Sequence, residues 1–225
     1  MPIWIKICGN TSLEHARLAV EAGADAVGFV FASSPRRVTV AEVAAIAPHL
    51  PAALEKIGVF VDAGLDEIVS AVRACGLTGV QLHSDAAPGL PAKLHERLGP
   101  ALRILRVVHF EAGVADVVSQ KIATYERDPH VNGVLVDSRT HAAVGGTGVV
   151  FDWAEARKTA LAESGRLKLI AAGGLNPANV AEAIGTLRPW GVDVVSGVET
   201  APGRKDADKV RSFVARARSA AAQIG

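Results

Sequence analysis

Two side chains of this 225-residue chain could together move protons. Cys8 ends a short apolar run and precedes an expected helix start, where a thiol can have its pKa drawn below about 8.5 and become a base or nucleophile. Asp137 ends the apolar run 133–137, and a partly desolvated carboxyl group has a raised pKa that suits proton donation. An inert buried thiol and a carboxylate that caps the next loop are the structural alternatives, and the pattern alone leaves both open.

Two glycine-containing turns could bind a phosphate group. Gly173 and Gly174 follow an apolar run and precede Asn176-Pro177, at which we expect a helix to begin, and Ser196 and Gly197 follow the last apolar run. Glycine lets the backbone approach a phosphate closely, and a helix start adds amide groups and the positive end of a dipole. Tight connections between strands and helices use the same residue types, so a purely structural interpretation stays equally open.

Other polar residues suggest contacts with a ligand but no metal. Arg36 could bind a carboxylate through two parallel hydrogen bonds, and His83, at the end of an apolar run, could contact a ligand or be a hydrogen-bonded rim histidine. The glycine-rich segment 145–148 lacks the ending of a phosphate-binding P-loop, and we expect a mobile loop over the site. The seven histidines show no metal-ligand spacing with carboxylates or thiols, so we predict no metal. We expect Cys75 to be structural.

The elements that must position these residues follow from an alternation of short apolar and longer amphipathic runs. The apolar runs are nearly continuous, which is typical of strands buried on both faces of a parallel sheet, and they cover 3–8, 24–31, 56–61, 79–83, 103–108, 133–137, 167–172 and 192–196. The amphipathic runs predict helices at 12–21, 41–47, 65–74, 91–98, 112–122, 153–162, 178–184 and 208–222. Thr11-x-x-Glu14 and Thr39-x-x-Glu42 are expected capping boxes.

Eight strand–helix units favour a single (β/α)8 TIM barrel that spans residues 1–225 as one α/β domain. Each unit has about 28 residues, so the barrel would be slightly smaller than the usual ~250 residues. A doubly wound open sheet remains the alternative, because local patterns do not show closure. In a barrel, the carboxyl ends of the strands meet at one face, and the polar residues described above would converge there.

Composition excludes several classes of protein. The 24 Lys and Arg residues balance 23 Asp and Glu residues, which removes the electrostatic argument for binding nucleic acid. A hydrophobic content of 49% is too high for a disordered chain, and no apolar run approaches the roughly 18 residues that would span a membrane. Two cysteines and the lack of a signal-peptide pattern predict a cytoplasmic protein. We expect a small-molecule substrate, and either a monomer or a homodimer.

The motifs in their order and spacing resemble phosphoribosylanthranilate isomerase, a family of the tryptophan pathway. The resemblance covers essentially the whole chain, and the specificity comes from the set rather than from any one motif. The motifs are KICGNT (6–11), GADAVGFVF (23–31), SPR (34–36), VQLH (80–83), VDS (136–138), GGTG (145–148) with FDW (151–153), AGGL (172–175), SGVE (196–199) and PGRKD (202–206).

The resemblance implies an Amadori rearrangement of N-(5-phosphoribosyl)anthranilate to 1-(2-carboxyphenylamino)-1-deoxyribulose 5-phosphate, with no organic cofactor or metal. It implies that Asp137 is the general acid on the furanose ring oxygen and that Cys8 is the general base at sugar C2. The other contacts that it implies are Arg36 with the anthranilate end, and Gly173, Gly174, Ser196 and Gly197 with the phosphate.

Three residues depart from the family's pattern. Ser84 stands where a glycine is common, Val195 replaces the first of two serines, and Val149 replaces a lysine after the segment 145–148. The first departure could alter the fourth loop, the second removes one hydroxyl near the expected phosphate, and the third removes a cation from the expected mobile loop. None of them changes the proposed acid–base pair.

Four other functions compete with this interpretation. A histidine-pathway isomerase performs the same chemistry on a phosphoribosyl aminoimidazole substrate, but such relatives carry an aspartate in place of Cys8 and repeated phosphate loops. A bifunctional enzyme that serves both pathways is disfavoured for the same reason. A ribulose-phosphate epimerase would be expected to show metal-ligand histidines and acids. A non-catalytic sugar-phosphate-binding barrel predicts a phosphate site without an acid–base pair.

Overall fold

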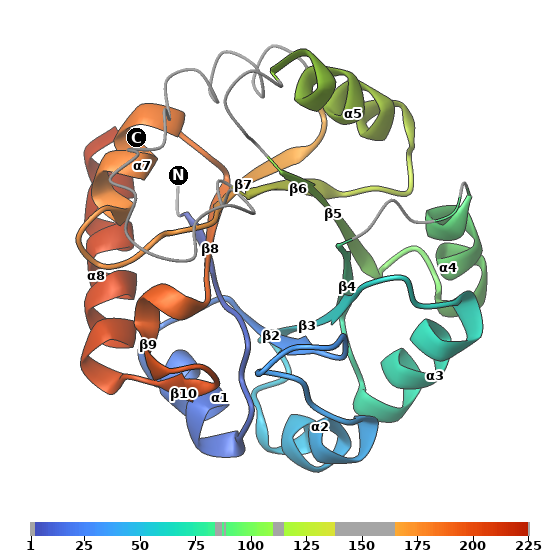
Figure 1. Cartoon of the computed structure of the whole chain (residues 1–225), viewed down its shortest axis with the longest axis horizontal. Coiled ribbons are helices and arrows are strands. Elements are labelled where there is room, and N and C mark those ends of the chain that lie inside the picture. Colours follow the sequence, from blue (N-terminus) through green and yellow to red (C-terminus); the bar gives the residue numbers. More distant parts are fainter. Residues whose placement is uncertain (1–2, 84–86, 88, 110–114, 138–164, 225) are drawn as a thin grey trace.

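The chain forms a closed barrel of eight parallel strands surrounded by helices (Figure 1). The computed structural model describes residues 3–83, 87, 89–109, 115–137 and 165–224. The strands follow one another around the barrel in chain order, and β8 pairs with β1 from Trp4↔Gly191 to Ile7↔Val194. This last pairing confirms the expected (β/α)8 barrel and excludes the open sheet.

The described strands and helices alternate along the chain as expected. The barrel strands are β1 (Trp4–Ile7), β2 (Ala26–Val30), β3 (Glu55–Phe60), β4 (Gly79–Leu82), β5 (Arg103–His109), β6 (Gly133–Asp137), β7 (Lys168–Ala172) and β8 (Gly191–Val194). The helices are α1 (Leu13–Glu21), α2 (Val40–Ile46), α3 (Leu65–Cys75), α4 (Leu90–Leu98), α5 (Ala115–Arg127), α7 (Val180–Leu187) and α8 (Ala207–Ile224). None of these helices is long and apolar enough to cross a membrane.

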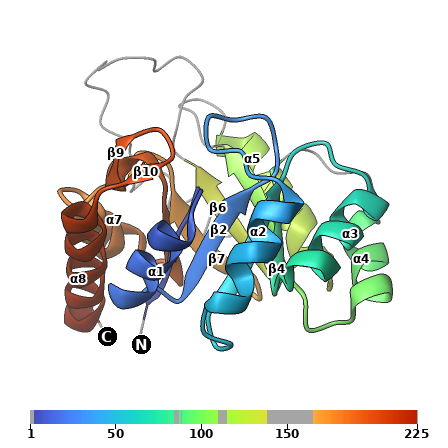
Figure 2. The same ribbon diagram turned by 90° about the horizontal axis from the view of Figure 1, so that it is seen from below.

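Short additional elements lie near the two ends of the barrel. The 3-10 helix η1 (Ala47–His49) extends α2, and η2 (Ser196–Val198) follows β8. The antiparallel pair β9 (Glu199–Ala201) and β10 (Arg204–Lys205) stands at the end of the barrel opposite to the chain termini (Figure 2). Ser196 therefore belongs to η2 rather than to the last strand, where the sequence placed it.

One expected helix cap and one expected helix start differ from the structure. At α1, the side chain that accepts a backbone hydrogen bond is Ser12, whereas Thr11 Oγ1 donates to Gly203 O at 2.7 Å and so contacts the β9–β10 pair. At α7, the regular helix begins at Val180 rather than at Pro177, although Asn176 Oδ1 accepts from the backbone N–H of Ala178 as expected of a cap. The capping box at Thr39 is confirmed.

Some predictions concern residues that lie outside those the structure describes. They are the helix at 153–162, the loop at 145–148, and the departures Ser84 and Val149. The expected helix at 112–122 corresponds to α5, of which residues 115–127 are described. Cys75 is buried at the end of α3 and donates to Val40 O, as expected for a structural cysteine.

Side chains alternate along each strand between the interior of the barrel and the layer under the helices. On β1, Trp4 belongs to the apolar cluster inside the barrel, whereas Ile5 and Ile7 belong to the larger cluster between strands and helices. Lys6 and Cys8 continue the inward-facing series. The same alternation places polar side chains inside the barrel on other strands.

Lys6, Gln81 and Asp193 form a buried polar layer inside the barrel. The ammonium group of Lys6 donates to Asp193 Oδ1 on β8 and to Gln81 Oε1 on β4, both at 2.9 Å. All three residues are buried. Burial alone would lower the pKa of Lys6, but the nearby Asp193 and Cys8 outweigh it and raise that pKa above its ordinary value. The ammonium group therefore stays charged and joins three strands.

Replacement of Lys6 by methionine is expected to lower the free energy of unfolding by about 3–5 kcal/mol, because the Asp193 carboxylate would stay buried without its cation. Urea unfolding followed by circular dichroism measures the change. The double variant Lys6→Met/Asp193→Leu removes both charges and should recover much of the lost stability. A single variant that unfolds at the wild-type urea concentration would contradict this account of the ion pair.

Candidate active site

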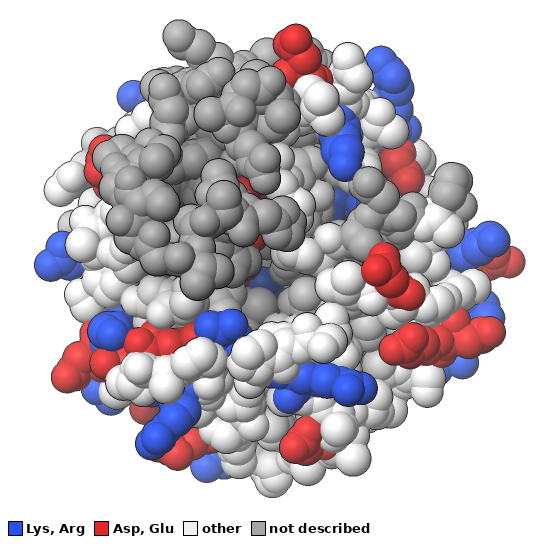
Figure 3. Space-filling model, viewed as in Figure 1, with Lys and Arg blue, Asp and Glu red and all other residues white. Residues whose placement is uncertain are grey.

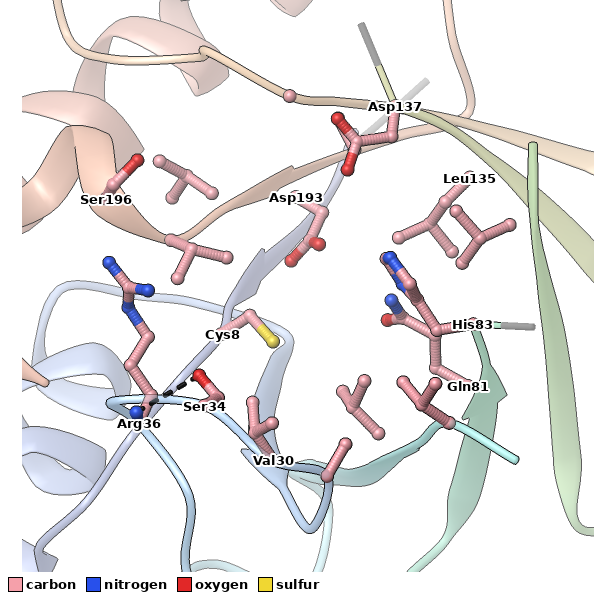
Figure 4. Close-up of a pocket in the computed structure, with 18 of the residues that line it drawn as sticks. Cys8, Val30, Ser34, Arg36, Gln81, His83, Leu135, Asp137, Asp193 and Ser196 are labelled. Atoms are coloured by element: carbon pink, nitrogen blue, oxygen red, sulfur yellow. Dashed lines mark hydrogen bonds between the residues drawn. The ribbon is translucent and has the colours of Figure 1, made fainter. Parts of the chain in front are cut away.

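A cavity of about 260 Å³ opens at the carboxyl ends of the barrel strands. Figure 4 shows Cys8 and Arg36 on one side of this cavity, and Asp137 and His83 on the other. Seven of the eight residues that the sequence singled out line it: Cys8, Arg36, His83, Asp137, Gly173, Gly174 and Ser196. Much of the remaining wall is apolar and includes Val30, Val59, Val61, Val107 and Leu135.

Cys8 reaches the cavity from the end of β1 and is only 3% exposed. Its backbone N–H donates to Val194 O at 2.9 Å, which fixes the end of β1 against β8. A Cβ atom on Gly28 would lie 2.5 Å from Cys8 Sγ, so glycine at this position of β2 is what leaves room for the thiol. Sequence reasoning did not single out Gly28.

Burial raises the pKa of the Cys8 thiol above its ordinary value, although the ammonium group of Lys6 acts in the opposite direction. The expected lowering of this pKa by a helix start is therefore wrong. The reason is positional, because Cys8 lies inside the end of the barrel while α1 begins only at Leu13. A thiol of this kind is protonated at neutral pH and is a strong base once it loses its proton.

Asp137 lies across the cavity from Cys8, with Asp193 between the two in the view of Figure 4. It ends β6 and is 3% exposed. Its Cα pairs with that of His109 on β5 and with that of Ala172 on β7, so neighbouring strands on both sides fix its position. Cys8 and Asp137 thus place a buried thiol and a buried carboxyl group on facing walls of the cavity, and the buried carboxylate of Asp193, the partner of Lys6, also lines it.

Arg36 is held at the cavity by a buried carboxylate. Its Nε and Nη2 donate to Glu199, with the shortest distance 2.6 Å between Nη2 and Oε2. The backbone N–H of Arg36 donates to Ser34 Oγ at 3.1 Å, the hydrogen bond drawn in Figure 4. The guanidinium group is therefore oriented within the pocket wall before any ligand arrives.

Lys205 completes this cluster and connects it to Cys8. Its Nζ donates to Glu199 Oε1 at 3.0 Å, to Cys8 O at 2.6 Å and to Val195 O at 3.2 Å. Burial opposes the charge of Glu199, but the hydrogen bond from Arg36 and the charge of Lys205 outweigh it and lower the pKa of Glu199. Burial also lowers the pKa of Lys205.

The roles of Glu199 and Lys205 escaped the sequence reasoning. Both lie in motifs that carry the resemblance, SGVE and PGRKD, and membership of these motifs was the one sign in the sequence that they could belong to the site. Across the rest of this face, the described acidic and basic side chains are interspersed (Figure 3). This distribution agrees with the formal net charge of +1.

The glycine turns form one corner of the cavity. Gly173 and Gly174 have φ angles of +79° and +62°, a backbone conformation that favours glycine, and both line the cavity. Ser196 lines the same corner. Gly197 does not, because it lies against the backbone of the neighbouring turn, where a Cβ atom would be 1.9 Å from Leu175 O. Gly197 therefore allows the two turns to approach each other.

The side chains of His83, His109 and Asp137 come together at the ends of three adjacent strands. A ligand atom from each lies within 4.8 Å of the other two. Their positions in the chain are too far apart for a spacing motif, which is why the sequence alone did not group them. The donor set of two imidazoles and one carboxylate is one that divalent transition metals accept.

The family model that matches this chain and a curated relative of it carry the same isomerase name. The family model described as N-(5'-phosphoribosyl)anthranilate (PRA) isomerase matches residues 5–216. A relative named N-(5'-phosphoribosyl)anthranilate isomerase from Geobacter sp. (strain M21) is 42% identical over 215 residues, which cover 95% of this chain and 97% of that protein.

Solved structures agree with this placement. The phosphoribosyl anthranilate isomerase from Thermotoga maritima superposes with a TM-score of 0.83 at 34% identity and covers 96% of this chain and 99% of its own. A second isomerase structure is in complex with reduced 1-(o-carboxyphenylamino)-1-deoxyribulose 5-phosphate and has a TM-score of 0.79 at 32% identity, with 96% and 99% coverage. The chain belongs to the N-(5'-phosphoribosyl)anthranilate isomerase family.

Proposed function

We propose that this chain catalyses the Amadori rearrangement of N-(5'-phosphoribosyl)anthranilate to 1-(2-carboxyphenylamino)-1-deoxyribulose 5-phosphate, a step of tryptophan synthesis. Membership of the family supports the reaction, and one geometric observation supports the roles of the residues. A buried thiol and a buried carboxyl group, Cys8 and Asp137, face the same cavity from different strands. An acid and a base at separate positions are what this rearrangement requires.

The first step opens the sugar ring. Asp137 donates a proton to the furanose ring oxygen, and the bond between C1 and that oxygen breaks. The lone pair of the anthranilate nitrogen forms a double bond to C1, which gives an iminium ion and leaves Asp137 as a carboxylate. The substrate's own nitrogen thus accepts the positive charge, so this step needs no organic cofactor or metal.

The second step moves the hydrogen at C2. The thiolate of Cys8 removes the proton from C2, and the electrons of that bond form a C1–C2 double bond while the iminium nitrogen recovers its lone pair. The product is an enolamine with a hydroxyl group on C2. Loss of the hydroxyl proton and protonation of C1 convert it to the ketone, so that the reaction is an isomerisation with no net gain or loss of atoms.

Lys6 supports the base without touching the substrate. Its ammonium group lies beneath Cys8 and favours the thiolate electrostatically, while burial opposes it. Asp193 and Gln81 fix the position of this ammonium group through hydrogen bonds of 2.9 Å. The positive charge is therefore preorganised where the negative charge of the thiolate develops.

The remaining wall of the cavity suits the two ends of the substrate. The glycine turn at Gly173 and Gly174, together with Ser196 and the turn that Gly197 permits, binds the phosphate through backbone amides and a hydroxyl group. The valine and leucine side chains accept the aromatic ring, and Arg36 binds the anthranilate carboxylate. His83 contacts the substrate from the wall beside Asp137.

Cys8→Ser and Asp137→Asn are each expected to lower kcat by a factor of about 10²–10⁴, because each removes one proton-transfer group. Substrate generated in situ and followed by its loss of fluorescence gives the rates, and circular dichroism checks folding. Cys75→Ala is the matched control, since this other buried cysteine lies outside the cavity, and it should keep the wild-type rate. Inactive wild-type protein would contradict the proposed substrate, and the aminoimidazole substrate of the histidine pathway would be tested next.

The pH dependence of kcat/KM follows from the raised pKa of Cys8. In the reacting form Cys8 must be deprotonated and Asp137 protonated, so kcat/KM should follow a bell-shaped profile. Because burial raises the pKa of the thiol, the higher of the two apparent pKa values of this profile should lie above the ordinary thiol range. A stopped-time assay across pH measures the profile. A profile whose higher apparent pKa lies at or below the ordinary thiol range would contradict Cys8 as the base.

A further inference from the structure

Three neighbouring strands end in side chains that are good ligands for transition metals. His83 follows β4, His109 ends β5 and Asp137 ends β6, and these strands are adjacent in the barrel. The Cα atoms of His109 and Asp137 are paired in register, and the rings of His83 and His109 meet edge to face with centroids 5.2 Å apart. Strand register therefore brings the three side chains to one point of the rim.

The distances are close to those that a metal ion needs. One ligand atom from each side chain lies within 4.8 Å of the other two. A tetrahedral ion with bonds of about 2.0–2.2 Å holds its ligand atoms about 3.4 Å apart. Side-chain rotations that move each ligand atom by roughly 1 Å would therefore bring all three within bonding distance of one ion. Strands hold the three backbones in place, so the adjustment falls on the side chains alone.

The chemistry of the donors selects the kind of ion. Two imidazoles and one carboxylate suit Zn²⁺, Co²⁺ and Ni²⁺, whereas Mg²⁺ and Ca²⁺ prefer sites made of oxygen ligands. Three protein ligands leave a fourth position of a tetrahedral ion open to water from the cavity. The site is thus of the open type and accessible from the same side as the substrate.

We propose that His83, His109 and Asp137 bind a divalent transition-metal ion such as Zn²⁺, and that the bound ion inhibits the isomerase. A metal-bound carboxylate cannot carry the proton that the ring oxygen needs, because metal and proton compete for the same oxygen atoms. The inhibitory half of this inference rests on the proposed role of Asp137. The binding half rests only on the positions of the three side chains.

Substitution of His109 can test the metal site independently of the proposed acid, base and substrate contacts. His83 and Asp137 line the cavity, whereas His109 is not among the described residues that line it. Replacement of His109 by asparagine therefore removes one metal ligand and leaves the proposed acid, base and substrate contacts in place. His49, an exposed histidine on η1, offers a matched control variant, His49→Asn.

Calorimetric titration of the EDTA-treated, dialysed protein with ZnCl₂ measures binding without any need for turnover. We expect one zinc site in the wild type and in His49→Asn, and an affinity for Zn²⁺ at least about 100-fold weaker in His109→Asn. Loss of a residue that only hydrogen-bonds to a metal ligand already lowers metal affinity by about 10–100-fold. Equal affinities in the wild type and His109→Asn would overturn the inference, as would the absence of binding to the wild type.

The thiol of Cys8 is the competing zinc ligand in this cavity, and Cys8→Ala distinguishes the two. The inference predicts that Cys8→Ala binds Zn²⁺ as the wild type does. Loss of binding in Cys8→Ala together with full binding in His109→Asn would assign the ion to the thiol and overturn the proposed site.

The isomerase assay at the same zinc concentrations tests inhibition. Wild type and His49→Asn should lose activity in proportion to occupancy and recover it when EDTA is added, while His109→Asn should keep its metal-free rate. Binding without inhibition would overturn the inhibitory half. A wild type that binds Zn²⁺ as expected but shows no metal-free activity would contradict the proposed function instead, so the two failures are distinguishable.

Discussion

The buried ammonium group of Lys6 is the interaction on which the candidate site depends. It joins β1 to β8, which is the pairing that closes the barrel, and reaches β4 through Gln81. A charge in this position is costly to bury, and the ion pair with Asp193 at 2.9 Å offsets that cost. The same ammonium group lies beneath Cys8 and stabilises its thiolate. One ion pair thus serves both the closure of the barrel and the chemistry at its rim.

A second buried cation, Lys205, connects separate chain segments at the carboxyl ends of the strands. Lys205 binds the carbonyl oxygens of Cys8 and Val195 and the carboxylate of Glu199, and Glu199 in turn orients Arg36. The residues that meet here come from the ends of β1 and β8, the loop after β2 and the β9–β10 pair. This pair is therefore part of the site although it contributes no strand to the barrel.

The strand ends explain how one wall can serve two purposes. Parallel strands in register place successive inward-facing residues next to one another, and at the rim this brings His109 beside Asp137. In the proposed function, this carboxyl group donates a proton from a position that strand geometry fixes. The neighbouring imidazoles give the same carboxyl group an environment that favours a transition-metal ion. Proton donation and metal binding are then alternative uses of one side chain.

The sequence by itself determined the alternation of eight strands with helices, because near-continuous apolar runs and amphipathic runs follow from local composition, and it favoured a barrel over an open sheet. Closure was decided by the pairing of β8 with β1 in the tertiary structure. The sequence also indicated Cys8 and Asp137 and, through the resemblance, the family. Only the tertiary structure decided that burial raises the pKa of Cys8, that Lys6 and Lys205 lie beside it, and that Glu199 binds Lys205. These features depend on contacts between residues up to 197 positions apart, such as Lys205 with Cys8, and local pattern carries no information about such contacts. Desolvation and ion pairing are properties of the folded interior, and they exist only once the strands have closed.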